Sequence, residues 1–540
     1  MDTILYNGKF ITLEDEGIVS ALLIRDDRIA ALGSLEDVQK CTGSDTPKVD
    51  IQGKTVIPGI VDSHNHIVSA GIAMDGVLLF GAATIDEACE RIRAKAATLP
   101  KGEWLLGAGW IESQFAENRP IHVSELDKAA PDNPLLIGRL FGGSLANTKA
   151  MELGGITQGT FQPQRGEIER DGSGRPTGYL KNGAEYMVSS IVPMYAGAGI
   201  DPLEEDMKAI IRSTSEYIKW GITTILDPGV SLRHMKAFHH TSKAGLLPLR
   251  VAMMPAWYGL SPHHIDKAEI RELIPRLGVS EGFGDQWLRF GALKMAIDGG
   301  VGSKTAMMNA PWRDGTVTTV QSRLDVNKLD DYFTEACLGG WSVGIHCCGD
   351  MAQDLALRSF DRVQKKYGWK HRNNIIHGYF PTDEALEIMA RQDIGVSVQP
   401  GFMYIEGDIY ENNLTKEKVD TFTPLKTYIK HGIRAFANSD MTSNYYNPFY
   451  GISSAVNRTT SQGKQLGDSE CVTVMEALKL FITNGAYYCG LEDVVGSLKA
   501  GKQADLAVLD KDILSVPSKE IMNIKVTRTY IGGKVVHCEQ

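Results

Sequence analysis

Two histidines close the stretch VIPGIVDSHNHI, which runs from residue 56 to residue 67. His64 and His66 follow an apolar run that predicts a buried strand, and side chains two residues apart on a strand point to the same face. Two imidazoles on one face favour a divalent metal ion such as zinc. The alternative is a pair of satisfied polar groups beside a loop, because the motif is short.

Four more residues with metal-binding or acid–base chemistry follow other apolar segments. They are Lys294 in GALKMAID, His346 in WSVGIH, His377 in NNIIH and Asp440 in IRAFANSD. Each lies at or near the carboxyl end of a predicted strand. A random distribution would also place such residues at strand starts, in helices and in turns. Their shared position therefore predicts one metal site built from six side chains.

The segments that carry these residues alternate with helical patterns. The predicted strands cover residues 56–62, 221–227, 249–255, 288–298, 341–346, 373–377, 394–400 and 433–440. Helical patterns such as 203–220 and 383–392 lie between them. This alternation implies parallel βαβ units, and eight of them predict an α/β fold with a closed (β/α)8 TIM barrel. Such a barrel carries its active site at the carboxyl ends of the strands.

The two ends of the chain predict short antiparallel strands, with a hairpin turn at Gly532 and Gly533. Neither end has enough apolar faces to be stable alone. We therefore expect residues 1–57 and 488–540 to form one small β-sandwich domain beside a barrel of residues 58–487. An insertion at about residues 70–205, after the first barrel strand, is expected to form a wall or lid over the site.

Composition restricts the class of partner. The chain has 540 residues, of which 43% are hydrophobic and 23% charged, and its formal net charge is -10. Without a Lys/Arg-rich block, neither nucleic acid nor an anionic membrane is an expected partner. We find no secretory signal and no apolar stretch long enough to span a bilayer. Eight cysteines without a paired CxxC spacing predict reduced thiols in the cytoplasm, so histidine and oxygen ligands must hold the metal.

The ordered set of motifs resembles the amidohydrolase superfamily and, within it, amidohydrolase family 3. The resemblance covers nearly the whole chain, through PGIVDSHNH, GITTILD, KMAIDGGVGSKTA, the two later histidines, NSD, and SLKAGKQADLAVLD with its terminal IGGKVV. It implies that His64 and His66 bind the more buried of two metals, that carboxylated Lys294 bridges both, that His346 and His377 bind the second, and that Asp440 contacts the metal and shuttles protons. Zinc is expected, as one or two ions, with manganese, iron or cobalt as alternatives.

Lys294 has a second interpretation. An ammonium group cannot bind a cation, so a lysine in this layer must lose its charge or be modified. The alternative is an ordinary salt bridge with Asp298, four residues further along the chain. In that case the site would hold a single metal ion.

These features predict a hydrolase acting on carbon–nitrogen bonds other than peptide bonds. Its substrate would be a small amide, N-substituted formamide or cyclic amide attacked by metal-activated hydroxide, with Asp440 as proton carrier. One alternative is a heterocycle deaminase on the same barrel with one metal. Another is a metal-free amidohydrolase-like scaffold, which the complete ligand set disfavours. A homodimer is the default expectation.

Several residues are candidates for substrate contact. Trp110 and Glu112 could line the pocket, although packing in the core or the lid is at least as strong an interpretation for the tryptophan. Ser303 lies in a turn after the fourth strand, with Thr305 beside it. Asn147 lies in RLFGGSLANTKA, which resembles a family segment where a histidine usually precedes the asparagine. In this chain Gly142 and Gly143 lie in the region where that histidine is expected. A set of loop aromatics could accept an aromatic substituent or pack the lid: Tyr379, Phe402, Tyr404, Tyr445 and Tyr446.

Overall fold

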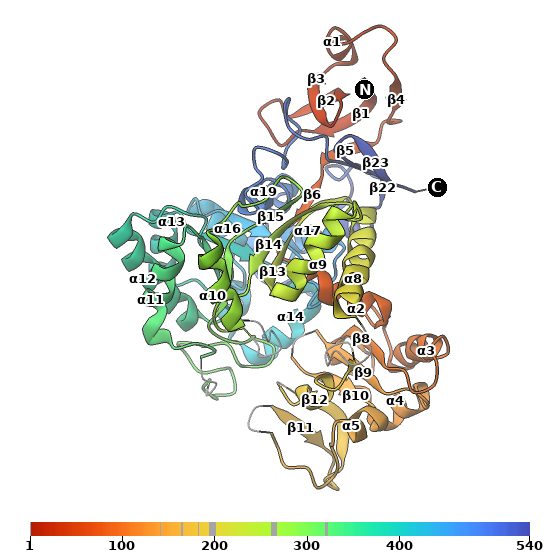
Figure 1. Ribbon diagram of the computed structural model, residues 1–540, viewed down its shortest axis with the longest axis vertical. Helices are drawn as coiled ribbons and strands as arrows, with labels where there is room; N and C mark the ends of the chain where they lie inside the picture. Colours follow the sequence, from red (N-terminus) through yellow and green to blue (C-terminus); the bar gives the residue numbers. More distant parts are fainter. Residues whose placement is uncertain are drawn as a thin grey trace.

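A computed structural model describes residues 2–140, 142–163, 166–181, 183–193, 201–260, 267–318 and 322–539. Three units follow one another along the longest axis (Figure 1). A sheet that contains both termini lies at one end, parallel strands surrounded by helices form the middle, and residues from the predicted insertion lie at the other end. The six predicted metal-site residues all belong to the middle unit or its edge.

The terminal unit is one eight-stranded sheet in the order β23-β22-β21-β5-β1-β2-β3, with β4 beside β1. Its strands are β1 (Asp2–Ile11), β2 (Ile18–Arg25), β3 (Arg28–Gly33), β4 (Lys48–Asp50), β5 (Thr55–Pro58), β21 (Leu506–Leu509), β22 (Val526–Ile531) and β23 (Lys534–Cys538), with helix α1 (Leu35–Gln39) alongside. Antiparallel pairing of β5 with β21 joins the two ends of the chain. Gly532 and Gly533 make the predicted hairpin turn, with φ of 54° and 73°. The ends pair as expected, while their packing as a sandwich stays a prediction.

The middle unit contains the parallel strands. They are β6 (Ile60–Asp62), β13 (Ile222–Val230), β14 (Arg250–Pro255), β15 (Leu288–Phe290), β16 (Leu293–Ala296), β17 (Val343–Cys347), β18 (Asn374–His377), β19 (Gly395–Val398) and β20 (Ala435–Ala437). They form two parallel sheets, β15-β14-β13-β6 and β16-β17-β18-β19-β20. Most of these strands are buried along their length, because helices cover the sheets, and this explains their nearly continuous apolar sequences.

The predicted fourth strand, 288–298, is wrong in one respect, because it is two strands. The strand is interrupted at Gly291, whose N–H donates to the Met253 carbonyl at 2.7 Å. β15 then pairs with β14, whereas β16 pairs with β17. A glycine weakens a strand and marks bends or close backbone approach. A bridge between Ala256 and Lys294 links the two parallel sheets at this point.

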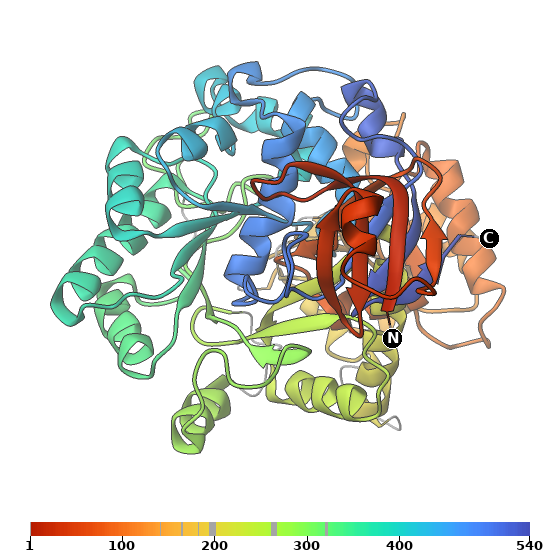
Figure 2. The same cartoon turned by 90° about the horizontal axis from the view of Figure 1, so that it is seen from above.

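Helices alternate with these strands and surround them, as the view from the terminal sheet shows (Figure 2). They are α8 (Pro202–Tyr217), α9 (Leu232–Lys243), α10 (Lys267–Leu277), α11 (Leu329–Leu338), α12 (Asp350–Tyr367), α13 (Asp383–Gln392), α14 (Gly401–Asn413), α15 (Lys416–Asp420), α16 (Leu425–Lys430), α17 (Pro448–Asn457), α18 (Val474–Phe481) and α19 (Thr483–Tyr488). The start of α8 follows from its sequence, since Asp201 caps it and Pro202 occupies the first turn. The predicted alternation of strands and helices is confirmed.

The insertion has a sheet of its own, in the order β11-β12-β10-β9-β8-β7. Its elements are α2 (Ile67–Asp75), β7 (Val77–Leu78), α3 (Ile85–Ala96), β8 (Leu105–Trp110), α4 (Val123–Ala129), β9 (Leu135–Arg139), β10 (Ser144–Ala146), α5 (Thr148–Leu153), β11 (Glu167–Arg170), β12 (Pro176–Lys181) and α6 (Tyr186–Ser189). Ile111 and Leu140 pack against Ile405 of α14 in a shared apolar cluster. The insertion therefore contacts a helix that follows strand β19. Of the described helices, none has the length and apolar character needed to cross a bilayer.

Candidate metal centre

The first group of side chains comes from the ends of strands β6 and β20. Asp440 Oδ1 lies 3.4 Å from His66 Nε2 and 3.7 Å from His64 Nε2. Lys294 Nζ of β16 lies 3.4 Å from the same His64 nitrogen. His64, His66 and Asp440 can each offer one ligand atom, and these atoms all lie within 4.8 Å of one another. We call His64, His66, Lys294 and Asp440 the open group, because 38% of the His66 side chain is exposed.

The second group comes from strands β17 and β18, and we call His346 and His377 the paired group. His346 Nδ1 lies 2.9 Å from His377 Nε2. The other nitrogen of His346 lies 3.0 Å from the Gly299 carbonyl oxygen, and the other nitrogen of His377 lies 2.7 Å from Gln399 Oε1. Cys348 Sγ lies 3.5 Å from His346 Nε2 and completes a second set of three possible donor atoms.

These contacts fix the tautomers of the paired group. The Gly299 carbonyl can only accept, so His346 Nε2 carries a proton, and the same reasoning assigns a proton to His377 Nδ1. Two neutral imidazoles then present unprotonated nitrogens to each other at 2.9 Å with no proton between them. A cation shared by the two lone pairs relieves this contact. The paired group thus fits a metal ion that prefers nitrogen ligands.

Burial keeps the imidazoles neutral, which is the form that binds a metal. It lowers the pKa of His377 to about 4 and the pKa values of His64 and His346 well below their usual range. The buried His64 Nδ1 has no hydrogen-bond partner among the described residues. The rings of His64 and His377 have centroids 6.2 Å apart, so the open and paired groups adjoin. The structure therefore brings all six predicted residues to one place.

The proposed salt bridge between Lys294 and Asp298 does not form among the described residues. Asp298 instead accepts hydrogen bonds from the backbone N–H groups of Met307, Cys348 and Gly349 at 2.8–2.9 Å. Lys294 is buried, and burial lowers its pKa to about 8. An amine with a lowered pKa loses its proton more readily, which favours modification or metal binding over simple ion pairing.

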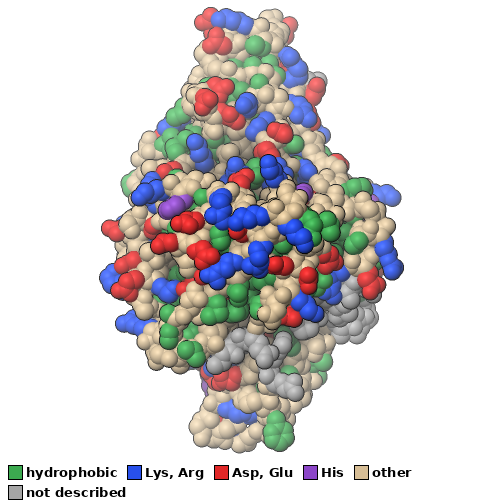
Figure 3. All heavy atoms as spheres, turned by 90° about the vertical axis from the view of Figure 1, so that its left-hand side faces the viewer, with side chains coloured by type: hydrophobic (Ala, Val, Ile, Leu, Met, Phe, Trp, Pro, Cys, Tyr) green, Lys and Arg blue, Asp and Glu red, His purple; other side chains and the backbone are tan. Residues whose placement is uncertain are grey.

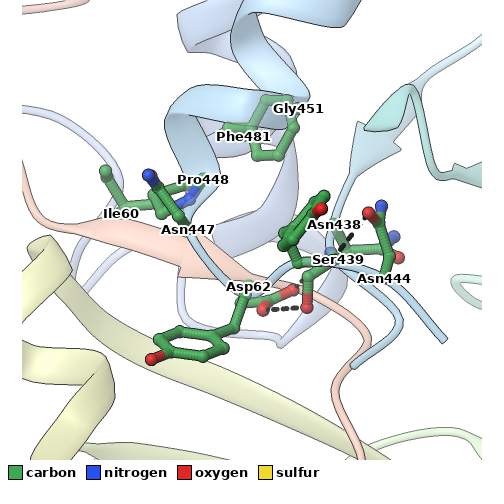
Figure 4. A pocket seen from close by; sticks show the side chains of 11 residues that line it. Ile60, Asp62, Asn438, Ser439, Asn444, Asn447, Pro448, Gly451 and Phe481 are labelled. Atoms are coloured by element: carbon green, nitrogen blue, oxygen red, sulfur yellow. Dashed lines mark hydrogen bonds between the residues drawn. The ribbon is translucent and has the colours of Figure 1, made fainter. Parts of the chain in front are cut away.

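A hydrogen-bond network supports the open group, and Figure 4 shows its contact between Asp62 and Ser439. Asp62, at the end of β6, accepts from the Ser439 N–H at 2.9 Å and from its hydroxyl at 2.6 Å. Asn65 Nδ2 donates to the same carboxylate at 2.9 Å, and Tyr217 donates to Asn65 Oδ1 at 2.8 Å. The chain on either side of His64 is thus tied to the chain that carries Asp440.

The network also reaches the paired group, through a residue that the sequence analysis missed. Gln399 accepts from His377 and donates to Asn438 Oδ1 at 2.9 Å. Asn438 and Ser439 directly precede Asp440, so one short segment contacts the supports of both groups. Gln399 is the last but one residue of the predicted seventh strand, and its position near a carboxyl end was the available signal.

Two predicted substrate contacts require correction, because the structure places them in the insertion core. Trp110 is fully buried, and its indole N–H donates to the Ile137 carbonyl at 3.1 Å. Asn147 caps α5: its side chain accepts from Ala150 N and Leu135 N, and donates to the carbonyls of Ala130 and Asn133. Four internal hydrogen bonds leave this amide none for a substrate.

The other two substrate candidates, Ser303 and Glu112, have different surroundings. Ser303 Oγ lies 2.8 Å from Thr305 Oγ1 in the loop that also supplies the Gly299 carbonyl, so its role stays a prediction. Glu112 makes a bidentate ion pair with Arg139, in which each carboxylate oxygen accepts a hydrogen bond from the guanidinium group.

The five aromatic residues predicted to lie on loops near the site do not line a single surface. Tyr379 and Phe402 are buried near His377, Tyr404 and Tyr445 lie near Tyr450, and Tyr446 packs on Tyr217.

Comparisons with known proteins agree with this geometry. The chain is 28% identical over 99% of its length to YtcJ of Bacillus subtilis strain 168, whose name assigns it to the amidohydrolases, and covers 99% of that protein. It is 28% identical to N-substituted formamide deformylase of Arthrobacter pascens, over 98% of this chain and 97% of that one. The crystal structure of an uncharacterized metal-dependent hydrolase from Pyrococcus horikoshii OT3 has the same fold, with a TM-score of 0.75 at 24% identity over 96% of this chain and 99% of that chain.

A profile described as the amidohydrolase family matches residues 48–537. That match spans the parallel strands, the insertion and the part of the terminal sheet from β4 onwards, and it leaves out β1, β2 and β3. The chain belongs to the amidohydrolase family, which confirms both the resemblance in its motifs and the prediction of a hydrolase acting on carbon–nitrogen bonds.

Proposed function

We propose that this chain is a metal-dependent hydrolase that cleaves the carbon–nitrogen bond of a small amide-type molecule, such as an N-substituted formamide. The observation that carries the proposal is the paired group, in which His346 Nδ1 and His377 Nε2 lie 2.9 Å apart while their outer nitrogens contact the Gly299 carbonyl and Gln399. The relative from Arthrobacter pascens, named as a formamide deformylase, supports the class of substrate.

We propose separate roles for the four histidines and Asp440. His64, His66 and Asp440 would hold one divalent ion, and His346 and His377 a second. A bound ion supplies Lewis acidity and lowers the pKa of water towards neutrality. Asp440 would accept a proton from the attacking water through Oδ1 and return it to the departing nitrogen once the substrate carbon is tetrahedral.

Lys294 would serve as a bridge between the two ions after carbon dioxide adds to its neutral amine. Its burial, its lowered pKa and its 3.4 Å distance from His64 Nε2 support this role. Zinc suits the donor set best, because imidazole and carboxylate are both ligands it accepts. Without the carbamate, the same residues would hold one ion.

The proposal extends to architecture. The parallel strands would close into an eight-stranded barrel in which β15 and β16 share one position. Hydrogen bonds from Asp440 N to the His64 carbonyl and from His66 N to the Met441 carbonyl join the end of β20 to the end of β6 and support closure. Residues 58–487 would form the barrel and the terminal segments a sandwich. The eight free thiols support a reducing, cytoplasmic location, and we expect a homodimer.

Metal analysis combined with a substrate screen tests the function. We expect purified protein to contain at least one divalent ion per chain, and zinc-, manganese- or cobalt-loaded protein to hydrolyse members of a panel of N-formyl amines, N-acyl amino acids and cyclic amides. Formation of a free carboxylate and amine distinguishes this reaction from deamination. A chain that binds no divalent metal, or that only releases ammonia from heterocycles, would contradict the proposal.

A further inference from the structure

A second cleft lies at the opposite end of the parallel strands from the candidate metal centre. It encloses about 690 Å³ and is lined at the starts of strands β15, β17 and β18 and at the ends of helices α12, α13 and α19. The metal-site histidines on β17 and β18 lie at the carboxyl ends of the same strands. A cavity of this size can hold a small organic molecule, and none of the six metal-site residues lines it.

The cleft is rich in positive charge, although the chain as a whole is acidic. Four side chains with a full positive charge line it and only two carboxylates do: Arg289, Lys370, Arg372 and Arg391 against Glu281 and Asp393. The whole chain has a formal net charge of -10. Figure 3 shows Lys and Arg side chains, interspersed with Asp and Glu, across the middle of the face that carries α11, α12 and α13. Arg372 and Arg391 pair with Glu492 and Asp361, which lie outside the lining, so Arg289 and Lys370 supply the positive charge that remains to attract an anion.

Two of the arginines converge on one point. A methyl group built on Gly490 would lie 3.5 Å from one terminal nitrogen of Arg289 and 3.6 Å from one of Arg372. One built on Gly282 would lie 2.9 Å from Arg289. Both glycines have positive φ, at 67° and 84°. The absence of side chains at positions 282 and 490 thus leaves room for the two guanidinium groups.

The arginines retain unused hydrogen-bond donors. The Nε atoms of Arg289 and Arg372 are buried and have no hydrogen-bond partner among the described residues. Arg289 makes no ion pair with a described carboxylate; it donates instead to the Gly490 carbonyl at 2.7 Å. Arg372 pairs with Glu492 and lies over the ring of Tyr487. Arg289 therefore lacks a carboxylate partner beside a second guanidinium, and an oxyanion would supply that partner.

We propose that this cleft binds the phosphate group of a small phosphorylated molecule, independently of the metal centre. Arg289 and Arg372 would grip the oxyanion, because a guanidinium matches phosphate geometry with paired N–H donors. Lys370 is exposed at the rim and makes no ion pair with any described residue, so it would add long-range attraction. The enclosed volume exceeds that of phosphate alone and leaves room for the organic part of the ligand.

Isothermal titration of the full-length, as-purified protein with inorganic pyrophosphate tests the proposal. Orthophosphate and citrate are titrated in parallel. Pyrophosphate binding that is at least tenfold tighter than that of orthophosphate indicates a phosphorylated metabolite, and equal affinities indicate free phosphate. Tighter binding of citrate than of either phosphate, or no binding of pyrophosphate at millimolar concentration, would overturn the proposal.

Variants locate the binding. We expect Arg289→Gln to weaken pyrophosphate binding about tenfold or more and Lys370→Gln, an exposed change that leaves packing intact, to weaken it several-fold. Arg93→Gln removes an equal charge from α3 in the insertion and should have no effect. Titration is repeated after chelator treatment, because metal ions also attract phosphate. Binding that disappears with the metal, or that survives in both cleft variants, assigns the ligand elsewhere and refutes the cleft.

Discussion

The open and paired groups of the metal centre differ in how their ligands are held. In the paired group, each imidazole uses its outer nitrogen for a hydrogen bond, to the Gly299 carbonyl or to Gln399, and turns its inner nitrogen toward the other imidazole. In the open group, His64 Nδ1 has no partner among the described residues, and His66 is more than one-third exposed. The first group is set in advance by the protein, whereas the second depends more on what binds there.

This difference suggests a division of roles. Ligands with fixed tautomers and orientations lose little freedom on binding an ion, so the paired group is suited to retaining it. The exposed edge at His66 gives the open group access to substrate and water, and Asp440 lies beside it at 3.4 Å. A carboxylate that carries protons to and from the substrate must lie on the side of the site that substrate and water can reach. We therefore expect substitutions in the open group to affect turnover most, and those behind the paired group to affect metal affinity.

The largest expected effect comes from Asp440→Asn. Asparagine has the same shape and tolerates the left-handed backbone at this position, where φ is 51°. It cannot accept and return a proton, so we expect kcat to fall at least 1,000-fold while the metal content stays near that of the parent protein. Steady-state kinetics and elemental analysis of the same sample measure the two quantities.

Asn147→Ala serves as the matched control for a polar residue outside the centre. It removes four internal hydrogen bonds and should lower stability, but the turnover of the folded fraction should change less than threefold. If Asp440→Asn keeps more than one-tenth of the parent turnover, Asp440 is not the proton carrier and the division of roles fails.

A pH effect on the metal-free protein is expected next in size. Burial lowers the pKa of His377 from 6.5 to about 4. Between these values the unfolded chain binds a proton that the folded chain rejects, so stability falls as the pH drops from about 6.5 to about 4. The loss from this group is on the order of 3 kcal/mol. Urea unfolding of chelator-treated protein across this range measures it.

His377→Asn isolates the contribution of this imidazole, because other buried groups titrate in the same range. The variant should lose stability less steeply below pH 6.5 than the parent chain. Parallel slopes for the two proteins would mean that the fold does not lower the pKa of His377, and burial would then not be what keeps this imidazole neutral.

The comparison also explains what sequence could and could not predict. The positions of the six candidate metal-site residues near strand ends could be predicted, because a polar residue that ends an apolar run lies at a sheet edge. The break at Gly291 was not, since it depends on which neighbour each half of the strand meets. Asn147 was misread as a substrate contact, although its place before a helical run was typical of an N-cap. The link from Gln399 to His377 joins two strands and has no local signature.

Gln399→Met should have a smaller effect, confined to the paired group. It removes the acceptor that fixes the His377 tautomer, and such losses lower metal affinity about 10- to 100-fold. Competition with a chromogenic chelator measures the affinity. Gln399→Glu keeps an acceptor at the same place and should bind metal more tightly than Gln399→Met. Equal affinities in the two variants would show that the hydrogen bond to Gln399 does not orient the imidazole.

Tyr379→Phe is expected to have the smallest effect and tests which neighbour holds His377 Nδ1. The tyrosine oxygen lies 3.2 Å from this nitrogen, whereas Gln399 Oε1 lies 2.7 Å away. A single N–H has one proton to share, and the shorter contact takes most of it. Loss of the hydroxyl should therefore change metal affinity less than threefold under the same chelator competition. A larger loss than in Gln399→Met would reverse the assignment and make Tyr379 the residue that orients the paired group.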